Sequence, residues 1–308
     1  MTMSAFEEAT VSRQFRQTLP SGHYDMIIVS LVHQKNNMIW HIADNIKKYV
    51  HGRFLWIVHC NSEIMIDENT LPDFAWMVRN PIKTTGHRWS VALTHGICRA
   101  LEFAIENVTF TNALMMSSGS AFFRHYDVPT FPRIGLINHT SLLSLSRGQH
   151  TMPVPIERIE SSSSYILENG SEIPWLYDRF EKDIPIHHLF KKFKWLKGGQ
   201  WSGSIFPYEV AKDVAADMKS VEAISCDTTL RDYAREEIVF STYAYNYAVT
   251  TGMTINMLET ITDWDYMYNP TIERVIQYRS VAGLFPGIGH LVCRLEDNYE
   301  GTREFLMR

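Results

Sequence analysis

The sequence predicts an α/β fold with a mostly parallel central sheet and crossover helices. Two observations indicate it: apolar β-branched runs alternate with helix-periodic segments, and they follow the order strand, helix, strand, helix, strand over roughly a hundred residues. The chain has 308 residues, of which 45% are hydrophobic and 20% charged, a composition typical of globular proteins. We expect a short polar tail over residues 1–22 and a single domain over residues 23–308.

These five elements can be placed in chain order. An apolar run over 24–34 predicts a buried strand, and apolar residues at helical spacing over 38–49 predict a helix that ends near the following glycine. A second buried strand is expected over 53–61, and a helix with one apolar face over 90–107. The run NALMMSSGS over 112–120 then predicts the third strand.

Polar or small residues stand at the end of each predicted strand. His33 and Lys35 lie at the end of the first strand, Asn61 ends the second, and Ser120 closes the third. Parallel α/β sheets bind ligands beyond the carboxyl ends of their strands. We therefore expect His33, Lys35 and Asn61 to contact a nucleotide; the alternative is that they are simply polar loop residues.

The middle of the chain is less regular. Residues 139–172 are rich in Ser, Pro and Gly, which predicts a long functional loop or a surface excursion. The segment 187–201 interleaves aromatic residues with lysines and is expected either to contact an anionic partner or to form an amphipathic element with solvated lysines. The lysines of that possible contact are Lys191, Lys192, Lys194 and Lys197.

Charge and cysteine content exclude several classes of protein. The net charge of −5 and the pI near 6.2 argue against a general nucleic-acid coat. The four cysteines lie far apart, without the spacing of a zinc knuckle or a disulfide framework. Neither a run of 18 apolar residues nor an apolar signal-peptide core occurs. We expect a cytoplasmic protein without a transmembrane segment.

Several catalytic motifs are missing from the sequence. It has no GxxxxGK[ST] phosphate loop, no HExxH and no GxSxG. Asp263-Trp264-Asp265 has the DxD spacing with which metal-dependent sugar transferases hold a cation, but a working DxD is expected near residue 120, where Ser118-Gly119-Ser120-Ala121 stands. We therefore expect no metal, and we assign Asp263 to an acceptor-side loop or a capped turn.

The last hundred residues combine a carboxylate pair with two separated cations. Glu236 and Glu237 are adjacent, and Arg279 and Arg303 follow them. A carboxylate that takes a proton and two guanidiniums that hold a departing diphosphate are the parts of a metal-free sugar transferase, because arginine offers phosphate oxygens a bidentate fork. The blander alternatives are a helix N-terminal carboxylate for Glu237 and surface ion pairs for the arginines.

Seven segments in collinear order carry a resemblance. They are VHQKNNM (32–38), FLWIVHCNSE (54–63), HRWSVALTHGICRALEFAIEN (87–107), NALMMSSGSAFF (112–123), KGGQWSGSIFPYEVAKDV (197–214), REEIVFSTYAYN (235–246) and YRSVAGLFPGIGHL (278–291). In order and wording they resemble glycosyltransferase family 14, the core-2/I-branching N-acetylglucosaminyltransferases and peptide xylosyltransferases. The resemblance covers about residues 24–305.

The resemblance implies a GT-A fold, a nucleotide-sugar half over 23–125 and an acceptor and catalytic half over 126–308. It implies an inverting, metal-independent transfer from a nucleotide-sugar, most simply a UDP-sugar, to a hydroxyl acceptor such as a glycan. The family's catalytic base falls on Glu237, and its diphosphate-binding cations fall on Arg279 and Arg303. Ser120, Trp201 and Asp263 are expected on the acceptor side. Ala121 replaces an aspartate that meets the acceptor in the family, and Asn61 replaces a frequent aspartate.

Two other functions stay open at this point. A sugar transferase that acts on hydroxylated DNA bases would use the same donor chemistry, with the segment 187–201 as its nucleic-acid groove. A non-catalytic carbohydrate-binding or nucleotide-sugar-binding protein would bind the donor without turnover.

Overall fold

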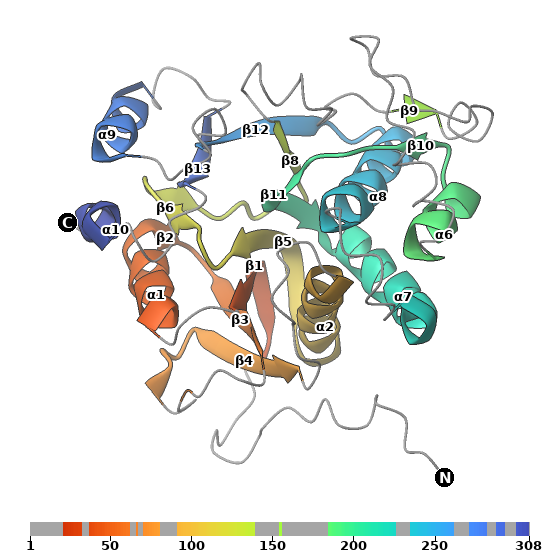
Figure 1. Cartoon of the computed structure of the whole chain (residues 1–308), viewed down its shortest axis with the longest axis horizontal. Coiled ribbons are helices and arrows are strands. Elements are labelled where there is room, and N and C mark those ends of the chain that lie inside the picture. The colour runs from red at the N-terminus through yellow and green to blue at the C-terminus, as the bar shows by residue number, and fades with distance from the viewer. Residues whose placement is uncertain are drawn as a thin grey trace.

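A computed structural model shows an α/β fold in which helices pack on a mixed, mostly parallel sheet (Figure 1). The residues that it describes are 21–32, 37–61, 66, 70–80, 91–138, 154–155, 184–225, 235–261, 271–281, 288–292 and 300–307. Within these ranges no helix is long and apolar enough to cross a membrane. The predicted tail and the loop predicted over 139–172 lie almost wholly outside them.

Seven strands form the body of the sheet, in the spatial order β4-β3-β1-β5-β11-β8-β12. Short strands β13 and β6 extend it beyond β12. All neighbouring strands run parallel except at β11, which is antiparallel to β5 and β8, and at β6. The strands are β1 (His23–Val32), β3 (Phe54–Asn61), β4 (Ala75–Asn80), β5 (Thr109–Ser117), β6 (Ala121–Phe122), β8 (Ile134–Asn138), β11 (Gln200–Pro207), β12 (Ile255–Ile261) and β13 (Ile288–Val292).

Helices cover both faces of this sheet. One face carries α2, α7 and α8, and the other carries α1, beside which α10 packs (Figure 1). The helices are α1 (Asn37–Tyr49), α2 (Val91–Asn107), α6 (Ile184–Lys192), α7 (Tyr208–Ser225), α8 (Arg235–Thr251), α9 (Ile272–Val281) and α10 (Glu300–Met307). Two short ribbons stand apart, β2 (Val50–His51) with β7 (Tyr126–Asp127) and β9 (Val154–Pro155) with β10 (Trp195–Leu196).

The five elements predicted for the first half are confirmed, with small shifts at their ends. The third strand stops at Ser117, three residues earlier than expected, because the chain turns there and the Ser120 N–H donates to the Ser117 carbonyl at 3.0 Å. Strand β4 was not predicted. It is a six-residue segment that pairs in parallel with β3 at the edge of the sheet.

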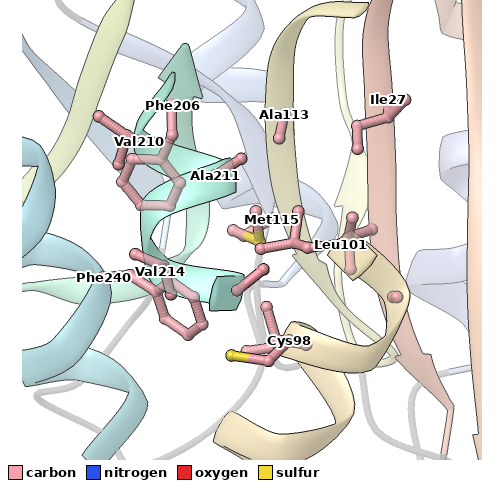
Figure 2. Close-up of a cluster of buried hydrophobic side chains, with 14 of the residues drawn as sticks. Ile27, Cys98, Leu101, Ala113, Met115, Phe206, Val210, Ala211, Val214 and Phe240 are labelled. Atoms are coloured by element: carbon pink, nitrogen blue, oxygen red, sulfur yellow. The ribbon is translucent and has the colours of Figure 1, made fainter. Parts of the chain in front are cut away.

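Alternation along each strand builds two hydrophobic cores. Ile27 points to the α2 face and Ile28 to the α1 face, as the two-residue period of a strand requires. On the α2 face, Leu101, Met115 and Phe206 belong to one cluster, to which α7 and α8 add further side chains (Figure 2). Each fully buried Val, Leu, Ile, Phe or Met side chain of such a cluster stabilises the fold by roughly 1.5–3 kcal/mol.

The order of the strands creates a topological switch point. Helix α1 connects β1 to β3 on one face, whereas α2 leads into β5 on the other face. After β1 the chain continues to β3 on one side, and after β5 it continues to β8 on the other side, so it leaves these neighbouring strands in opposite directions. In doubly wound sheets a ligand binds beyond the carboxyl ends of the strands at such a switch point.

Asn45 fixes the short strand β6 to helix α1. Its Nδ2 donates to the Phe122 carbonyl at 3.0 Å, and its Oδ1 accepts from the Phe122 N–H at 2.6 Å. Asn45 is only 2% exposed. This one amide therefore bonds both backbone groups of Phe122.

Replacing Asn45 by alanine is expected to lower the free energy of unfolding by roughly 2–4 kcal/mol, because two buried backbone groups lose their partner. Urea unfolding measures the change. Asp44→Ala, at the exposed neighbouring position of the same helix, should change stability by less than about 0.5 kcal/mol. Equal effects of the two substitutions would contradict the role of Asn45 in fixing β6 to α1.

Candidate functional site

Three serine hydroxyls meet where β5 ends and β11 begins. The Ser120 hydroxyl lies 2.6 Å from that of Ser117 and 2.8 Å from that of Ser202. The Ser117 N–H donates to the Ser202 hydroxyl at 3.0 Å. Ser120 and Ser202 are each 2% exposed. This serine cluster lies at the carboxyl end of β5, beside the switch point of the sheet.

Glu237 lies in the first turn of α8 and is half-buried, whereas its neighbour Glu236 is fully buried. Successive helical side chains point about 100° apart, so the two carboxylates face different surroundings. The helix dipole favours a negative charge in this turn. Of the two, only the Glu237 side chain combines partial shielding with access to solvent.

The loop 197–199 is held along α8. The Thr242 hydroxyl accepts from the Lys197 N–H at 3.0 Å and pairs with the Lys197 carbonyl at 3.1 Å. Further along, the Gly199 N–H donates to the Glu237 carbonyl at 3.0 Å. Lys197 is 4% exposed, its ammonium donates to the Gly198 carbonyl at 3.0 Å, and burial lowers its pKa to about 8.

Strand β11 connects this loop to the serine cluster. Ser202 lies three residues after Gly199, which in an extended chain is about 10 Å. Trp201 lies between them, 8% exposed, in the hydrophobic cluster on the α2 face. Ser120, Trp201 and the Glu237 backbone thus belong to one neighbourhood.

Arg279 is held at the other end of the segment 117–123. Its Nε donates to the Phe123 carbonyl at 2.6 Å, and its Nη2 donates to the Tyr49 hydroxyl at 2.7 Å. The guanidinium also lies 5.1 Å from the Phe305 ring centre. Phe123 is three residues beyond Ser120, so about 10 Å of extended chain separates this arginine anchor from the serine cluster.

Arg303 lies near Arg279 in the fold. It is on α10, 7% exposed, and α10 packs against α9, α1 and β6. The Tyr49 hydroxyl donates to the Leu306 carbonyl at 2.5 Å and so ties this helix to α1. The two arginines expected to bind a diphosphate therefore gather around β6, whereas Glu237 lies on α8.

Some of the predicted site residues cannot be placed. His33, Lys35 and Asp263 lie outside the described residues, and Asn61 is described only as the last backbone position of β3. Their expected roles in nucleotide and acceptor binding stay predictions.

The lysine-rich segment 187–201 is an integrated part of the fold. Lys192 and Tyr243 both bond the carboxylate of Asp217, and the His188 Nε2 lies 3.3 Å from it. Burial acts to raise the pKa of Asp217, but the bonds from Lys192 and Tyr243 outweigh it and hold the pKa below its usual range. Of the four lysines, Lys191 and Lys194 are exposed without a described ion pair, whereas Lys197 is buried.

A buried histidine on β3, His59, and a half-buried one on α2, His95, were not anticipated from the sequence. His59 on β3 is 4% exposed and faces α2 at Gly96, where an added Cβ would lie 3.0 Å from its ring. Burial, with smaller contributions from His95 and Arg99, lowers the pKa of His59 to about 3. Burial and the charge of Arg99 lower the pKa of His95 to about 4.

No protein-family model matches this sequence, and no curated protein does either. The geometry of the site is therefore the basis for a functional proposal. The start of β11 connects the backbone of Glu237 to the serine cluster. The segment 117–123 then connects the serine cluster to Arg279.

Acid is expected to destabilise the fold through His59 and His95. Both have folded-state pKa values below the unfolded value of 6.5, so this stability is complete above pH 6.5 and is lost as the pH falls toward about 4 and 3. Each neutral histidine contributes a slope of about 1 kcal/mol per pH unit. Urea unfolding between pH 7.5 and 5 measures it.

His59→Asn removes one titrating group and should flatten that slope by about 1 kcal/mol per pH unit. A wild-type slope in the His59 variant would show that folding does not lower the pKa of His59.

Proposed function

We propose that this chain is an inverting, metal-independent glycosyltransferase that moves a sugar from a nucleotide-sugar, most simply a UDP-sugar, to a hydroxyl acceptor. The observation that carries the proposal is the placement of Glu237. Its carboxylate is half-buried in the first turn of α8. Its backbone carbonyl accepts from Gly199, and one short stretch of β11 leads from there to the serine cluster at the carboxyl end of β5.

The sheet is compatible with the GT-A fold that the resemblance implies. Numbered along the chain, its seven main strands stand in the order third, second, first, fourth, sixth, fifth, seventh, and the sixth is antiparallel. The first four strands form a doubly wound half with a switch point, which suits a nucleotide. The segments after β5 supply Glu237 and the arginines.

In the proposed reaction the Glu237 carboxylate takes the proton of the acceptor hydroxyl. The hydroxyl oxygen forms a bond to the anomeric carbon while the bond from that carbon to the nucleotide diphosphate breaks on the opposite face. The configuration at carbon is therefore inverted, and the diphosphate leaves with the electron pair. A base within about 3 Å of the hydroxyl contributes roughly 10²–10⁴-fold to such a step.

The negative charge on the departing diphosphate needs a counter-charge. Arg279 and Arg303 are two cations gathered around β6, and fixed cations at such a position are typically worth a few kcal/mol in the transition state. Arg279 uses two of its N–H groups on Phe123 and Tyr49, which fixes its orientation before a phosphate arrives. A guanidinium carries five N–H donors, so others remain for phosphate oxygens.

Glu237→Gln is expected to reduce turnover by roughly 10²–10⁴-fold while donor affinity stays near wild type, because the amide keeps the shape but cannot take a proton. Release of nucleotide diphosphate measures turnover, and calorimetry measures donor binding. Glu209→Gln is the matched control, an exposed first-turn carboxylate on α7, and should retain full activity. Glu236 is unsuitable as a control because it is fully buried.

Donor binding and turnover are expected to persist in EDTA, since arginines rather than a divalent cation compensate the diphosphate. The measurement is calorimetry and turnover with EDTA and with added Mg²⁺ or Mn²⁺. If EDTA abolishes donor binding and turnover and the added metal restores them, a bound metal ion rather than the arginines compensates the charge of the diphosphate.

A further inference from the structure

Two exposed histidines meet on the ribbon formed by β2 and β7. The His51 Nε2 lies 2.7 Å from the His125 Nδ1, and the rings stack with centroids 4.9 Å apart. One nitrogen of this hydrogen bond donates and the other accepts, so at least one ring is neutral. If the donor nitrogen gives up its proton, by a shift to its other ring nitrogen or by release to solvent, both nitrogens present lone pairs to the space between the rings.

A third polar group shares the face of these histidines. Along the chain His125 is exposed, Tyr126 buried and Asp127 exposed, so the two exposed residues point outward from the same face. In the parallel pairing, His51 is the register partner of Asp127, and it too is exposed. His51, His125 and the Asp127 carboxylate thus occupy one outward patch.

The backbone beneath this patch is firmly set. The Val128 N–H donates to the His51 carbonyl at 2.9 Å. Gly52 has φ +117°, and a Cβ there would lie 2.3 Å from the Val128 side chain. Only glycine at position 52 therefore lets the chain after β2 approach the chain after β7 this closely. The patch is therefore arranged before any ligand binds.

We propose that His51 and His125 form a binding site for a late first-row divalent ion such as Zn²⁺ or Ni²⁺, with Asp127 as the neighbouring carboxylate. Imidazole nitrogen is a preferred ligand of these ions. With bonds of about 2.0–2.1 Å and tetrahedral angles, the two nitrogens would stand about 3.3 Å apart. The rings need to open by only about 0.6 Å from their present separation, and their exposure permits it.

The proposed metal ligands are none of the residues given a role in the transferase reaction, although His125 packs on Tyr49, which also holds Arg279. As the side chains lie, no three His, Cys, Asp or Glu groups among the described residues converge on one metal position, so water completes the coordination. The ribbon lies just before the amino end of β3, whereas the serine cluster lies at the carboxyl end of β5. A bound ion would tie β2 to β7 next to Tyr49, whose ring contacts His125 and whose hydroxyl holds α10.

The test uses the full chain after removal of metals with EDTA and dialysis. We expect calorimetry to show one Zn²⁺ or Ni²⁺ per chain with a dissociation constant below about 100 µM, and the melting temperature to rise by a few degrees at excess ion. MgCl₂ should do neither, because Mg²⁺ prefers oxygen ligands. Affinity should fall as the pH is lowered, since protons compete for imidazole nitrogen.

Variants assign the ligands. His51→Gln and His125→Gln should each abolish the binding and the rise in melting temperature, Asp127→Asn should weaken binding less, and the exposed His23→Gln should have no effect. The proposal is overturned if no ion binds with a dissociation constant below about 100 µM, or if binding survives in either histidine variant. Because EDTA is expected to leave donor turnover intact, failure of this site and failure of the transferase proposal are distinguishable.

Discussion

Antiparallel pairing of β11 with β5 joins the two parallel blocks of the sheet and also determines where the site lies. Ile205, Phe206 and Pro207 pair with Leu114, Ala113 and Asn112. This register brings Ser202 to the end of β5, where its hydroxyl meets Ser120. The same strand begins just after Gly199, which bonds the first turn of α8. A shift of one residue in the register would turn every β11 side chain to the other face. It would then separate the Ser202 hydroxyl from Ser120.

Local patterns were sufficient to predict the first half of the fold. Buried strands such as 24–34 and one-sided helices such as 90–107 have a periodicity that survives without tertiary context. Strand β4 was missed because it is short and gains its place only by pairing with β3. Its edge position could not be inferred from six residues alone.

The site was only partly predictable for the same reason. Glu237 and Arg279 were singled out by residue type, yet nothing local indicates that Arg279 would be oriented by the Phe123 carbonyl, 156 positions away. Ser202 and the buried His59 carry no sequence signal, because a serine or a histidine in a strand is ordinary until its neighbours are known. The proximity of Lys197 to α8 likewise depends on Thr242, 45 positions along the chain.

Hydrogen–deuterium exchange with and without a saturating UDP-sugar tests the central claim most directly, because it locates the donor on the chain. The account predicts slower amide exchange in residues 117–123, at the start of β11 and in the first turn of α8. Little change is predicted in α6 and in the β2–β7 ribbon. The proposed site would be contradicted if exchange slowed only in α6 and the β2–β7 ribbon, or if no nucleotide-sugar slowed exchange anywhere at saturating concentration.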